Sequence, residues 1–348
     1  MSEKLSDAAY EKLMTHVGWQ VDRVMSLDTS GKQIVPALYD AAVAEVGGPL
    51  TMTAARKLRE VVAPGDVVGL ITGFPSRSFL APGISETDGP VGAAFLARMV
   101  EEVLGAVPII ITETSLVKYS ASPSLAAGLL VTDVEGALRS KHGAVRASAV
   151  GILPFPTDDA EAQRVTRDFF EKIRPKALVA IEMPSKAQDG FGHTAGGRRI
   201  VDEYLAKTDY LFHWAPQYGA LRIGLGDGGN EMGTANVREA LYRVEPVGRD
   251  IAAVTESDVC VMGASSNWAA YGIGACLEAL TFNTRVLRRI DLGGMIRRCA
   301  DEGAIDGRTL RPEPLVDGTP LAMNLAVVDF MAYLIEKALE TAGVQVAR

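Results

Sequence analysis

The sequence predicts an α/β fold: a mostly parallel central sheet of about six strands, with helices on both faces in a Rossmann-like three-layer arrangement. Short apolar runs alternate with segments of helical periodicity through the middle of the chain, which is typical of βαβ units. The chain has 348 residues, 48% of them hydrophobic, and 35 glycines, which suits a compact, loop-rich protein of this class.

The first part of the chain, residues 1–62, is predicted to be a helical N-terminal extension. Apolar residues recur at helical spacing over residues 5–27, and two further helical patterns cover residues 35–46 and 51–62. A Pro-Gly-Asp turn signal at residues 64–66 then separates the extension from the first predicted strand.

Six short apolar runs are predicted to be the strands of the core. Each run is continuous and bounded by turn residues, as buried parallel strands are. The predicted strands cover residues 67–72, 108–112, 148–153, 177–182, 220–225 and 258–263. The helices predicted after them cover residues 92–104, 124–139, 159–173, 196–208, 230–243 and 268–280.

We expect one domain over residues 1–348, because no Pro/Ser linker or break in composition divides the chain. Its core is residues 63–285, and residues 286–348 form a loop excursion followed by a C-terminal helix. Gly, Pro and charged residues concentrate in 291–322, which predicts a lid-like loop, whereas residues 325–341 have helical spacing. A homo-oligomer paired through that helix is one alternative, but a helix packed on the core would show the same pattern.

Charge and cysteine content narrow the range of partners. The net charge of −8 argues against nucleic acid, which requires a basic face, and leaves a small molecule as the expected partner. No apolar run approaches the ~20 residues that span a bilayer, so no membrane partner is expected. The three cysteines, Cys260, Cys276 and Cys299, have no CxxC spacing, and their odd number fits a reduced protein. The expected location is therefore the cytoplasm.

Acidic residues follow the ends of several predicted strands. Glu86 and Asp88 lie in the long loop after the first strand, and Asp227 and Glu231 lie in a glycine-rich loop after the fifth. The carboxyl ends of parallel strands meet at one edge of a sheet, so these four carboxylates could converge in one cleft. Their mutual repulsion is costly unless a cation, a shared proton or a polar substrate offsets it.

The loop at residues 226–231, Gly-Asp-Gly-Gly-Asn-Glu, is the strongest candidate site. Its glycines, Gly228 among them, permit positive φ angles and close approach to a ligand. Asp227 and Glu231, joined by Asp88, offer oxygen ligands for Mg²⁺ or Mn²⁺. Asn230 or its neighbours would cap the next helix. The alternative is an ordinary turn with a capped helix; it suffices for Glu231 alone, whereas Asp227 among three glycines favours function.

Other strand-end residues could complete the site. Glu182 directly follows a strand and is a candidate base, and Lys186 in the same loop is a candidate for binding a substrate carboxylate. His193 lies in a Gly-rich stretch that could close over a ligand. Thr72 and Gly73 end the first strand, where the backbone could line the site.

Ser266 and Asn267 follow the last predicted strand and could donate hydrogen bonds to a carboxylate or an oxyanion. Helix capping is the alternative for both residues, as it is for Asp88 before Gly89 and Pro90.

A nucleotide cofactor is not predicted. Gly224, Gly226 and Gly229 match the spacing GxGxxG, but no acidic residue ends a following strand about 20 residues later, as a dinucleotide fingerprint requires. No GK[ST] sequence occurs, so the phosphate-binding loop of P-loop nucleotide-binding proteins is also absent.

Four sequence motifs stand at the ends of the predicted strands. They are Thr-Gly-Phe-Pro at 72–75, Glu-Thr-Asp-Gly-Pro at 86–90, Gly-Leu-Gly-Asp-Gly-Gly-Asn-Glu-Met-Gly at 224–233 and Ser-Asn-Trp-Ala-Ala-Tyr at 266–271. Single pieces of these motifs occur elsewhere, but their combination is distinctive. With them, the chain resembles the D-glutamate cyclase family, long catalogued as a domain of unknown function, over about residues 60–285. The resemblance implies a lyase that interconverts D-glutamate and 5-oxo-D-proline plus water.

For this chemistry, a divalent cation on Asp227, Glu231 or Asp88 would polarise the γ-carboxylate or activate water. Glu182 or Glu86 would be the base, and Lys186, Ser266 and Asn267 would hold the α-carboxylate. Two other functions use the same residues. One is a metal-assisted hydrolase or hydro-lyase acting on another small lactam or carboxylate, and the other is a non-catalytic protein that binds an acidic metabolite.

Overall fold

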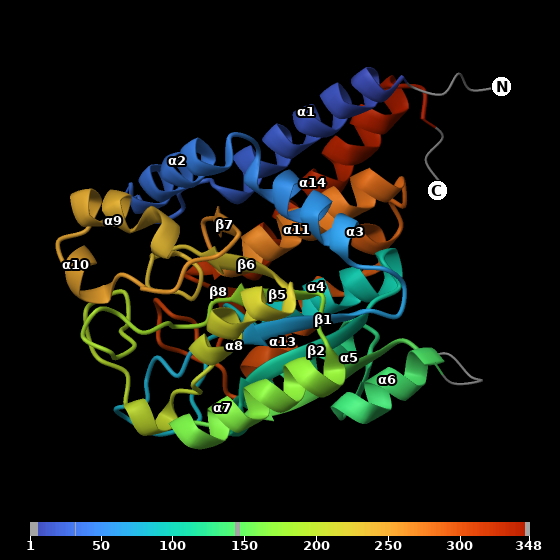
Figure 1. Cartoon of the computed structure of the whole chain (residues 1–348). Coiled ribbons are helices and arrows are strands. Elements are labelled where there is room, and N and C mark those ends of the chain that lie inside the picture. Colours follow the sequence, from blue (N-terminus) through green and yellow to red (C-terminus); the bar gives the residue numbers. More distant parts are fainter. Residues whose placement is uncertain (1–5, 32, 143–146, 345–348) are drawn as a thin grey trace.

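A computed structural model describes residues 6–31, 33–142 and 147–344, and it confirms the predicted α/β class (Figure 1). These residues form a seven-stranded sheet in the order β3-β4-β2-β1-β5-β6-β7, and every pair of neighbouring strands is parallel. The strands are β1 Val67–Thr72, β2 Val107–Glu113, β3 Leu130–Thr132, β4 Ala149–Phe155, β5 Ala177–Ile181, β6 Leu221–Gly226 and β7 Val259–Met262. Parts of the predicted extension and of the predicted domain, at residues 1–5, 32, 143–146 and 345–348, lie outside the described residues.

The helices surround this sheet, and their bounds are close to the prediction in the N-terminal third of the chain. The helices are α1 Asp7–Met25, α2 Ile34–Val46, α3 Leu50–Val61, α4 Pro90–Val103, α5 Val117–Ala126, α6 Val134–His142, α7 Asp159–Asp168, α8 Asp209–Trp214, α9 Arg238–Val244, α10 Gly248–Ile251, α11 Ser266–Thr281, α12 Val286–Arg289, α13 Leu292–Asp301 and α14 Leu321–Thr341. Short helical turns cover Thr114–Leu116, Asp202–Tyr204, Ala215–Tyr218 and Ala235–Val237, and a π-helical turn at Phe169–Ile173 extends α7.

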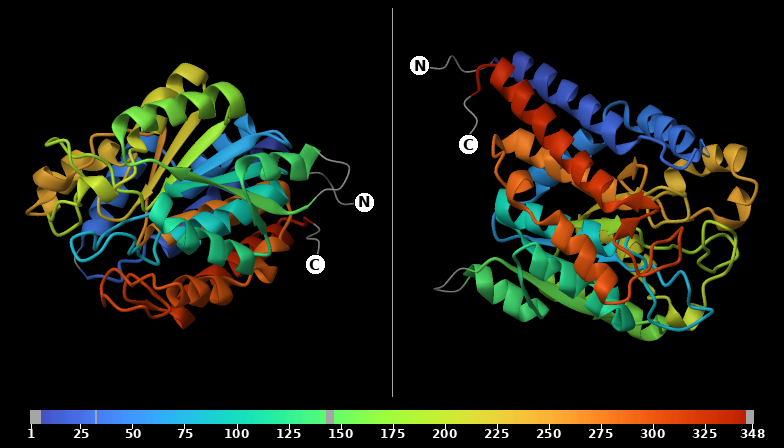
Figure 2. Two further views of the ribbon diagram at one scale, coloured as in Figure 1. Left: turned by 90° about the horizontal axis from the view of Figure 1, so that it is seen from below. Right: turned by 180° about the vertical axis from the view of Figure 1, so that it is seen from behind.

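Helices lie on both faces of the sheet (Figure 2), and a separate apolar core packs between the helices and each face. In β1, Val68 and Leu70 belong to one core, whereas Val67 and Ile71 belong to the other, as the two-residue period of a strand requires. Helices α3, α4 and α11 cover the first face, with α1 and α14 packed outside them, and α6 and α7 cover the second. No helix of the described residues is long and apolar enough to cross a membrane.

The predicted helix over residues 124–139 is wrong. Helix α5 ends at Ala126, the short edge strand β3 follows, and α6 starts at Val134. Gly128 has a φ of +80° after the end of α5, and the Asp133 side chain accepts a hydrogen bond from the Gly136 N–H at 2.7 Å in the first turn of α6. The sheet therefore has one more strand than the sequence predicted.

Two other predicted helices are also wrong or too long. Residues 196–208 form an irregular loop, in which Gly197 has a φ of +83°, and the next helix is α8. Residues 230–243 are helical only from Ala235 onward, so no helix starts at Asn230 and the predicted cap there does not exist.

The segment predicted as a lid-like loop at residues 291–322 is partly regular structure, although residues 302–314 belong to no helix or strand. It contains α13, whose first turn is capped by Asp291 accepting the Gly294 N–H at 2.8 Å. A two-stranded hairpin follows, with β8 at Leu315–Val316 and β9 at Thr319–Pro320. In the segment before the hairpin, Ile305 forms a β-bridge with Glu86. This bridge holds the C-terminal part of the chain beside the loop that follows β1.

The strand order creates a crevice between β1 and β5. After β1 the chain passes through α4, which packs on the first face, to β2 on one side. After β5 it passes through α8, whose apolar residues join the core of the second face, to β6 on the other side. In an open parallel sheet, a ligand site forms at the carboxyl ends of strands where the connections diverge in this way.

Asp22 of α1 ties the three N-terminal helices together. Its buried carboxylate accepts the Leu50 N–H at 2.6 Å and the Thr51 N–H at 3.1 Å at the start of α3. It also accepts hydrogen bonds from the Thr51 hydroxyl and, at 3.1 Å, from the Tyr39 hydroxyl of α2.

We predict that Asp22→Ala lowers the free energy of unfolding by about 2–3 kcal/mol, because it leaves buried donors without an acceptor. Urea unfolding followed by circular dichroism measures the change. Asp7→Ala, which removes an exposed acid from the first turn of the same helix, is the matched control and should change stability by less than about 1 kcal/mol. Equal losses in the two variants would contradict the role given to Asp22.

Candidate active site

Five carboxylates, hereafter the acid cluster, meet at the carboxyl edge of the sheet. Single carboxylate oxygens of Asp88, Asp227 and Asp317 lie within 4.8 Å of one another, and so do those of Glu182, Asp227 and Glu231. Asp227 belongs to both groups and therefore connects them. The prediction that acids of separate strand-end loops converge is thus confirmed for Asp88, Asp227 and Glu231.

Four segments of the chain place the five acids around the crevice, and Asp227 and Glu231 share the loop after β6. Asp227 directly follows β6, Glu182 directly follows β5, and Asp88 lies two residues before α4. Two of the acids have left-handed backbones, with φ of +46° at Glu182 and +49° at Asp317. Non-glycine residues rarely adopt this conformation, so the surrounding structure must hold both carboxylates in position.

The N-terminus of α11 holds Asp88. The Asp88 carboxylate accepts the Ser266 N–H at 2.9 Å and the Asn267 N–H at 2.8 Å. The Asn267 side chain in turn accepts the N–H groups of Gly89 at 3.0 Å and Gly92 at 2.6 Å, and it donates to the Thr87 carbonyl at 3.2 Å. The Asn267 amide therefore positions the loop that carries Asp88, and its hydrogen bonds are used within the chain.

Glu182 and Glu231 are oriented by separate sets of donors. The Ser266 hydroxyl lies 2.7 Å from Glu182 Oε2 and donates to it. The Glu231 carboxylate accepts the N–H groups of Gly228 at 2.8 Å and Gly229 at 2.7 Å, and of Asp227 at 3.2 Å. Glu231 thus closes its own glycine-rich loop and fixes the backbone at Asp227.

Electrostatics make the cluster costly when all its members are ionised. Burial raises the pKa of Asp88, Glu182 and Asp227 well above the ordinary range, and repulsion from neighbouring acids raises each further. Burial also raises the pKa of Asp317. Among the described residues, no Lys, Arg or His nitrogen forms an ion pair with any of the five carboxylates.

The cluster could therefore hold a divalent cation as well as protons. Carboxylate oxygens from three or more residues are ligands suited to Mg²⁺ or Mn²⁺. Asp88, Glu182 and Glu231 are buried, whereas Asp227 and Asp317 remain partly exposed. The group of Asp88, Asp227 and Asp317 is thus the more accessible of the two.

Glu86 lies beside the cluster and belongs to neither group. Its pKa rises to about 7, first because of burial and then because of repulsion from Asp317. The Glu86 carboxylate packs against Gly307, in the segment before the hairpin. The contact is so close that a Cβ atom added at Gly307 would lie 2.8 Å from Glu86 Oε2. The predicted convergence of Glu86 with the other acids is therefore only partial.

Thr72 and Gly73 lie next to the loop that carries Asp88. The buried Thr72 hydroxyl has no hydrogen-bond partner among the described residues, and a Cβ on Gly89 would lie 2.7 Å from it. Gly73 has a φ of +125°, which turns the chain out of β1. Their position at the crevice agrees with the prediction that they line the site.

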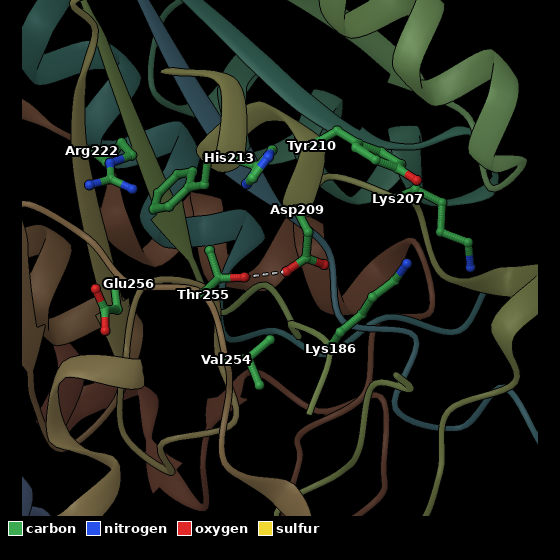
Figure 3. A pocket seen from close by; sticks show the side chains of 10 residues that line it. Lys186, Lys207, Asp209, Tyr210, His213, Arg222, Val254, Thr255 and Glu256 are labelled. Carbon is green, nitrogen blue, oxygen red and sulfur yellow. Dashed lines mark hydrogen bonds between the residues drawn. The ribbon is translucent and has the colours of Figure 1, made fainter. Parts of the chain in front are cut away.

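Lys186 and His193 contact acids other than those of the acid cluster. Lys186 Nζ lies 3.6 Å from Asp159, and Lys186 lines a separate cavity of about 480 Å³ (Figure 3), so its binding of a substrate carboxylate stays a prediction. The chain turns this way because Pro184 forms a bridge with Glu231, which directs the following residues toward α8. His193 is buried, and its Nε2 lies 3.3 Å from Asp189.

Asn230 supports the loop after β5 instead of a helix. Its side-chain NH₂ donates to the His193 carbonyl at 2.9 Å, so the two glycine-rich loops are joined. The Asn230 side-chain oxygen and His193 Nδ1 are buried without hydrogen-bond partners among the described residues. Gly228 packs closely against both Asn230 and Glu231. A Cβ atom added at Gly228 would lie only 2.6 Å from Asn230 Oδ1 and 3.2 Å from Glu231 Oε1.

Asp317 is the site residue that sequence reasoning missed. It forms the turn between β8 and β9 together with Gly318, and both residues have positive φ. An Asp-Gly pair between two short extended runs is a hairpin signal, so the turn was recognisable in the sequence. Its contact with the acids was not, because the hairpin is held there by distant groups, including a 2.7 Å hydrogen bond from the Gly318 N–H to Asp306.

The fold and the site together define an α/β protein with an acidic centre at the switch point of a parallel sheet. The model of the D-glutamate cyclase-like C-terminal family matches residues 21–332. The chain belongs to this family, as its sequence motifs indicated.

Human mitochondrial D-glutamate cyclase is 31% identical to this chain over 215 residues. The match covers 61% of this chain and 32% of the human protein, so the chain aligns with about a third of that relative.

We predict that, in the presence of a chelator, stability falls as pH rises. The folded state binds protons more tightly than the unfolded chain at each acid with a raised pKa. The proton-linked stability is therefore complete at about pH 4 and is lost as pH rises through the folded pKa, near 7 for Glu86.

Urea unfolding between pH 4 and 8 tests this prediction. Asp227→Asn should flatten the slope, because it removes one ionisable member of both groups. Asp301→Asn, at the exposed C-terminal end of α13, should leave the slope unchanged. A slope that is the same in all three proteins would show that the acid cluster does not control it.

Proposed function

We propose that the chain interconverts D-glutamate and 5-oxo-D-proline plus water, as a lyase similar to D-glutamate cyclase. The observation that carries the proposal is the position of Asp227 in both carboxylate groups at the sheet switch point. Membership of the D-glutamate cyclase-like family supports it. The resemblance to the human enzyme also supports it, although the match covers only part of that protein.

The reaction requires one bond to form and one to break. The α-nitrogen attacks the carbon of the γ-carboxyl group, and one carbon–oxygen bond of that group then breaks. The α-ammonium nitrogen loses two protons in all, the departing carboxylate oxygen gains two, and water leaves. The attack is intramolecular, so holding the chain of glutamate in a folded conformation supplies much of the rate acceleration.

Glu182 is the proposed base for the amine. It is buried, its pKa is raised, and the Ser266 hydroxyl fixes its orientation at 2.7 Å. A carboxylate with a raised pKa can accept a proton from nitrogen and return it to the departing oxygen. In the hydrolytic direction, the same group would accept a proton from water.

Asp88, Asp227 and Asp317 are the proposed ligands of a divalent cation, Mg²⁺ or Mn²⁺. When bound, the cation would supply positive charge that makes the γ-carboxyl carbon more electrophilic and lowers the pKa of water. Asp317 takes the place of the predicted ligand Glu231 in this proposal, because Glu231 belongs to the other carboxylate group, which is the less accessible of the two. Glu231 would then act by holding the loop of Asp227.

Four further expectations from the sequence stay proposals. These are the organisation as one domain, a small molecule as the partner, a homo-oligomer and a cytoplasmic location. Hydrolysis of another small lactam would use the same residues, so the assay must compare substrates as well as variants.

We predict that Asp227→Asn lowers turnover of D-glutamate at least about 100-fold, because the variant loses a charge shared by both groups. Chiral chromatography of D- and L-glutamate and of both 5-oxoproline enantiomers measures the conversion. Asp301→Asn, with an exposed acid far along the chain, is the control and should retain activity. An Asp227→Asn variant that is folded and fully active would refute the assignment.

We also predict that Mg²⁺ or Mn²⁺ raises the Tm of the chelator-treated protein, by binding the folded state. Asp317→Asn should weaken this effect by reducing cation affinity. Glu182→Gln should largely preserve it, because Glu182 belongs to the other group. A cation effect that depends on Glu182 and not on Asp317 would place the cation in the other group.

A further inference from the structure

A groove with a volume of about 560 Å³ borders the acid cluster at Asp317. Its walls come from the end of α1 with the residues that follow it, from the start of α11 and from α14. The volume is within the range of small-molecule sites in proteins. Most of the wall is apolar, formed by Val24, Leu27, Trp268, Met323, Val327 and Phe330.

Large apolar side chains are exposed in this groove. Leu27 is 57% exposed, Met323 is 53% exposed and Phe330 is 52% exposed. Met323 and Phe330 lie seven residues apart on α14 and therefore on the same face of the helix. A group of exposed apolar side chains next to a polar site indicates a surface that binds an apolar group.

The polar end of the groove is continuous with the acid cluster. Asp317, whose carboxylate belongs to one of the two groups, also lines the groove. Trp268 directly follows Ser266 and Asn267, which hold Asp88, and its indole N–H donates to Asn324 at 2.8 Å. A ligand that reaches the cluster from this side would therefore place its remaining part against the apolar wall.

The negative charge of the acid cluster favours a ligand that carries fewer carboxylates than free D-glutamate. Free D-glutamate carries an α-carboxylate besides the reacting γ-carboxylate, and five carboxylates surround the proposed reaction site. Among the described residues that line the groove, Arg308 is the one basic side chain. Arg308 already acts on Asp317: burial raises the pKa of that carboxyl, whereas the positive charge of Arg308 lowers it. A ligand whose α-carboxyl group is an amide carries one negative charge less than free D-glutamate, and its amide oxygen could accept a hydrogen bond from Arg308 without competing with Asp317 for that charge.

We propose that the groove binds an apolar amide substituent, so that the preferred substrate is a D-glutamyl amide or its 5-oxo-D-prolyl counterpart. The inference rests on the proposed function. The α-amine again attacks the γ-carboxyl carbon, one carbon–oxygen bond breaks and water leaves. The amide bond at the α-carbon stays intact, and no oxidant or other reactant is consumed.

The test compares D-glutamate α-anilide with free D-glutamate. We expect a kcat/KM at least about 10-fold higher for the anilide, the gain typical of filling an apolar pocket. Phe330→Ala should remove most of that gain and leave the reaction of free D-glutamate unchanged. Leu125→Ala, which truncates a similarly exposed leucine on α5, is the matched control and should change neither reaction.

Equilibrium dialysis with the anilide separates this inference from the proposed function. Binding that Phe330→Ala weakens about 10-fold, without turnover of either compound, would support the groove and refute the cyclase reaction. Turnover of free D-glutamate as fast as the anilide, unaffected by Phe330→Ala, would overturn the groove and support the reaction. A dimer that Phe330→Ala dissociates in sedimentation would also overturn it, because a second copy would then cover the groove.

Discussion

The gathering of five carboxylates, none of which forms an ion pair within the described part of the chain, is the constraint on which the rest of this structure depends. Burial and mutual repulsion raise the pKa of Asp88, Glu182 and Asp227. An isolated cluster of this kind would spread apart, since each ionised acid gains by moving into water. The fold prevents this, because the segments that carry the acids are fixed by the strands β5 and β6, by the start of α4 and by the β8–β9 hairpin.

Bringing the acids together also requires an unfavourable backbone conformation at two of them. Glu182 and Asp317 adopt left-handed conformations that side chains disfavour, and the packing of the core and the hairpin maintains them. The N-terminus of α11 offsets some of the charge by donating two N–H groups to Asp88. Ser266 links this helix to Glu182, so a shift of α11 would move acids of both groups together.

The sequence predicted the parts of the site that depend on local patterns. The bounds of β1 agree with the apolar run at residues 67–72, and Asp227 follows a strand as expected. The contribution of Asp317 could not be predicted, because it depends on where a hairpin from far along the chain packs. The surroundings of Lys186 depend on long-range packing in a similar way: its loop follows a strand, as expected, but its Nζ lies 3.6 Å from Asp159 at the start of α7.

The two carboxylate groups differ in a way that suggests a division of roles. Glu182 and Glu231 receive hydrogen bonds from a hydroxyl and from backbone N–H groups, which hold them in fixed orientations. Asp227 and Asp317 are partly exposed, and Asp317 comes from the C-terminal segment that also borders the apolar groove. The sheet therefore supplies the proposed proton-transfer group, whereas the C-terminal segment supplies Asp317 and part of the groove proposed to bind the apolar end of the substrate. Changes in that segment could alter substrate choice without disturbing Glu182.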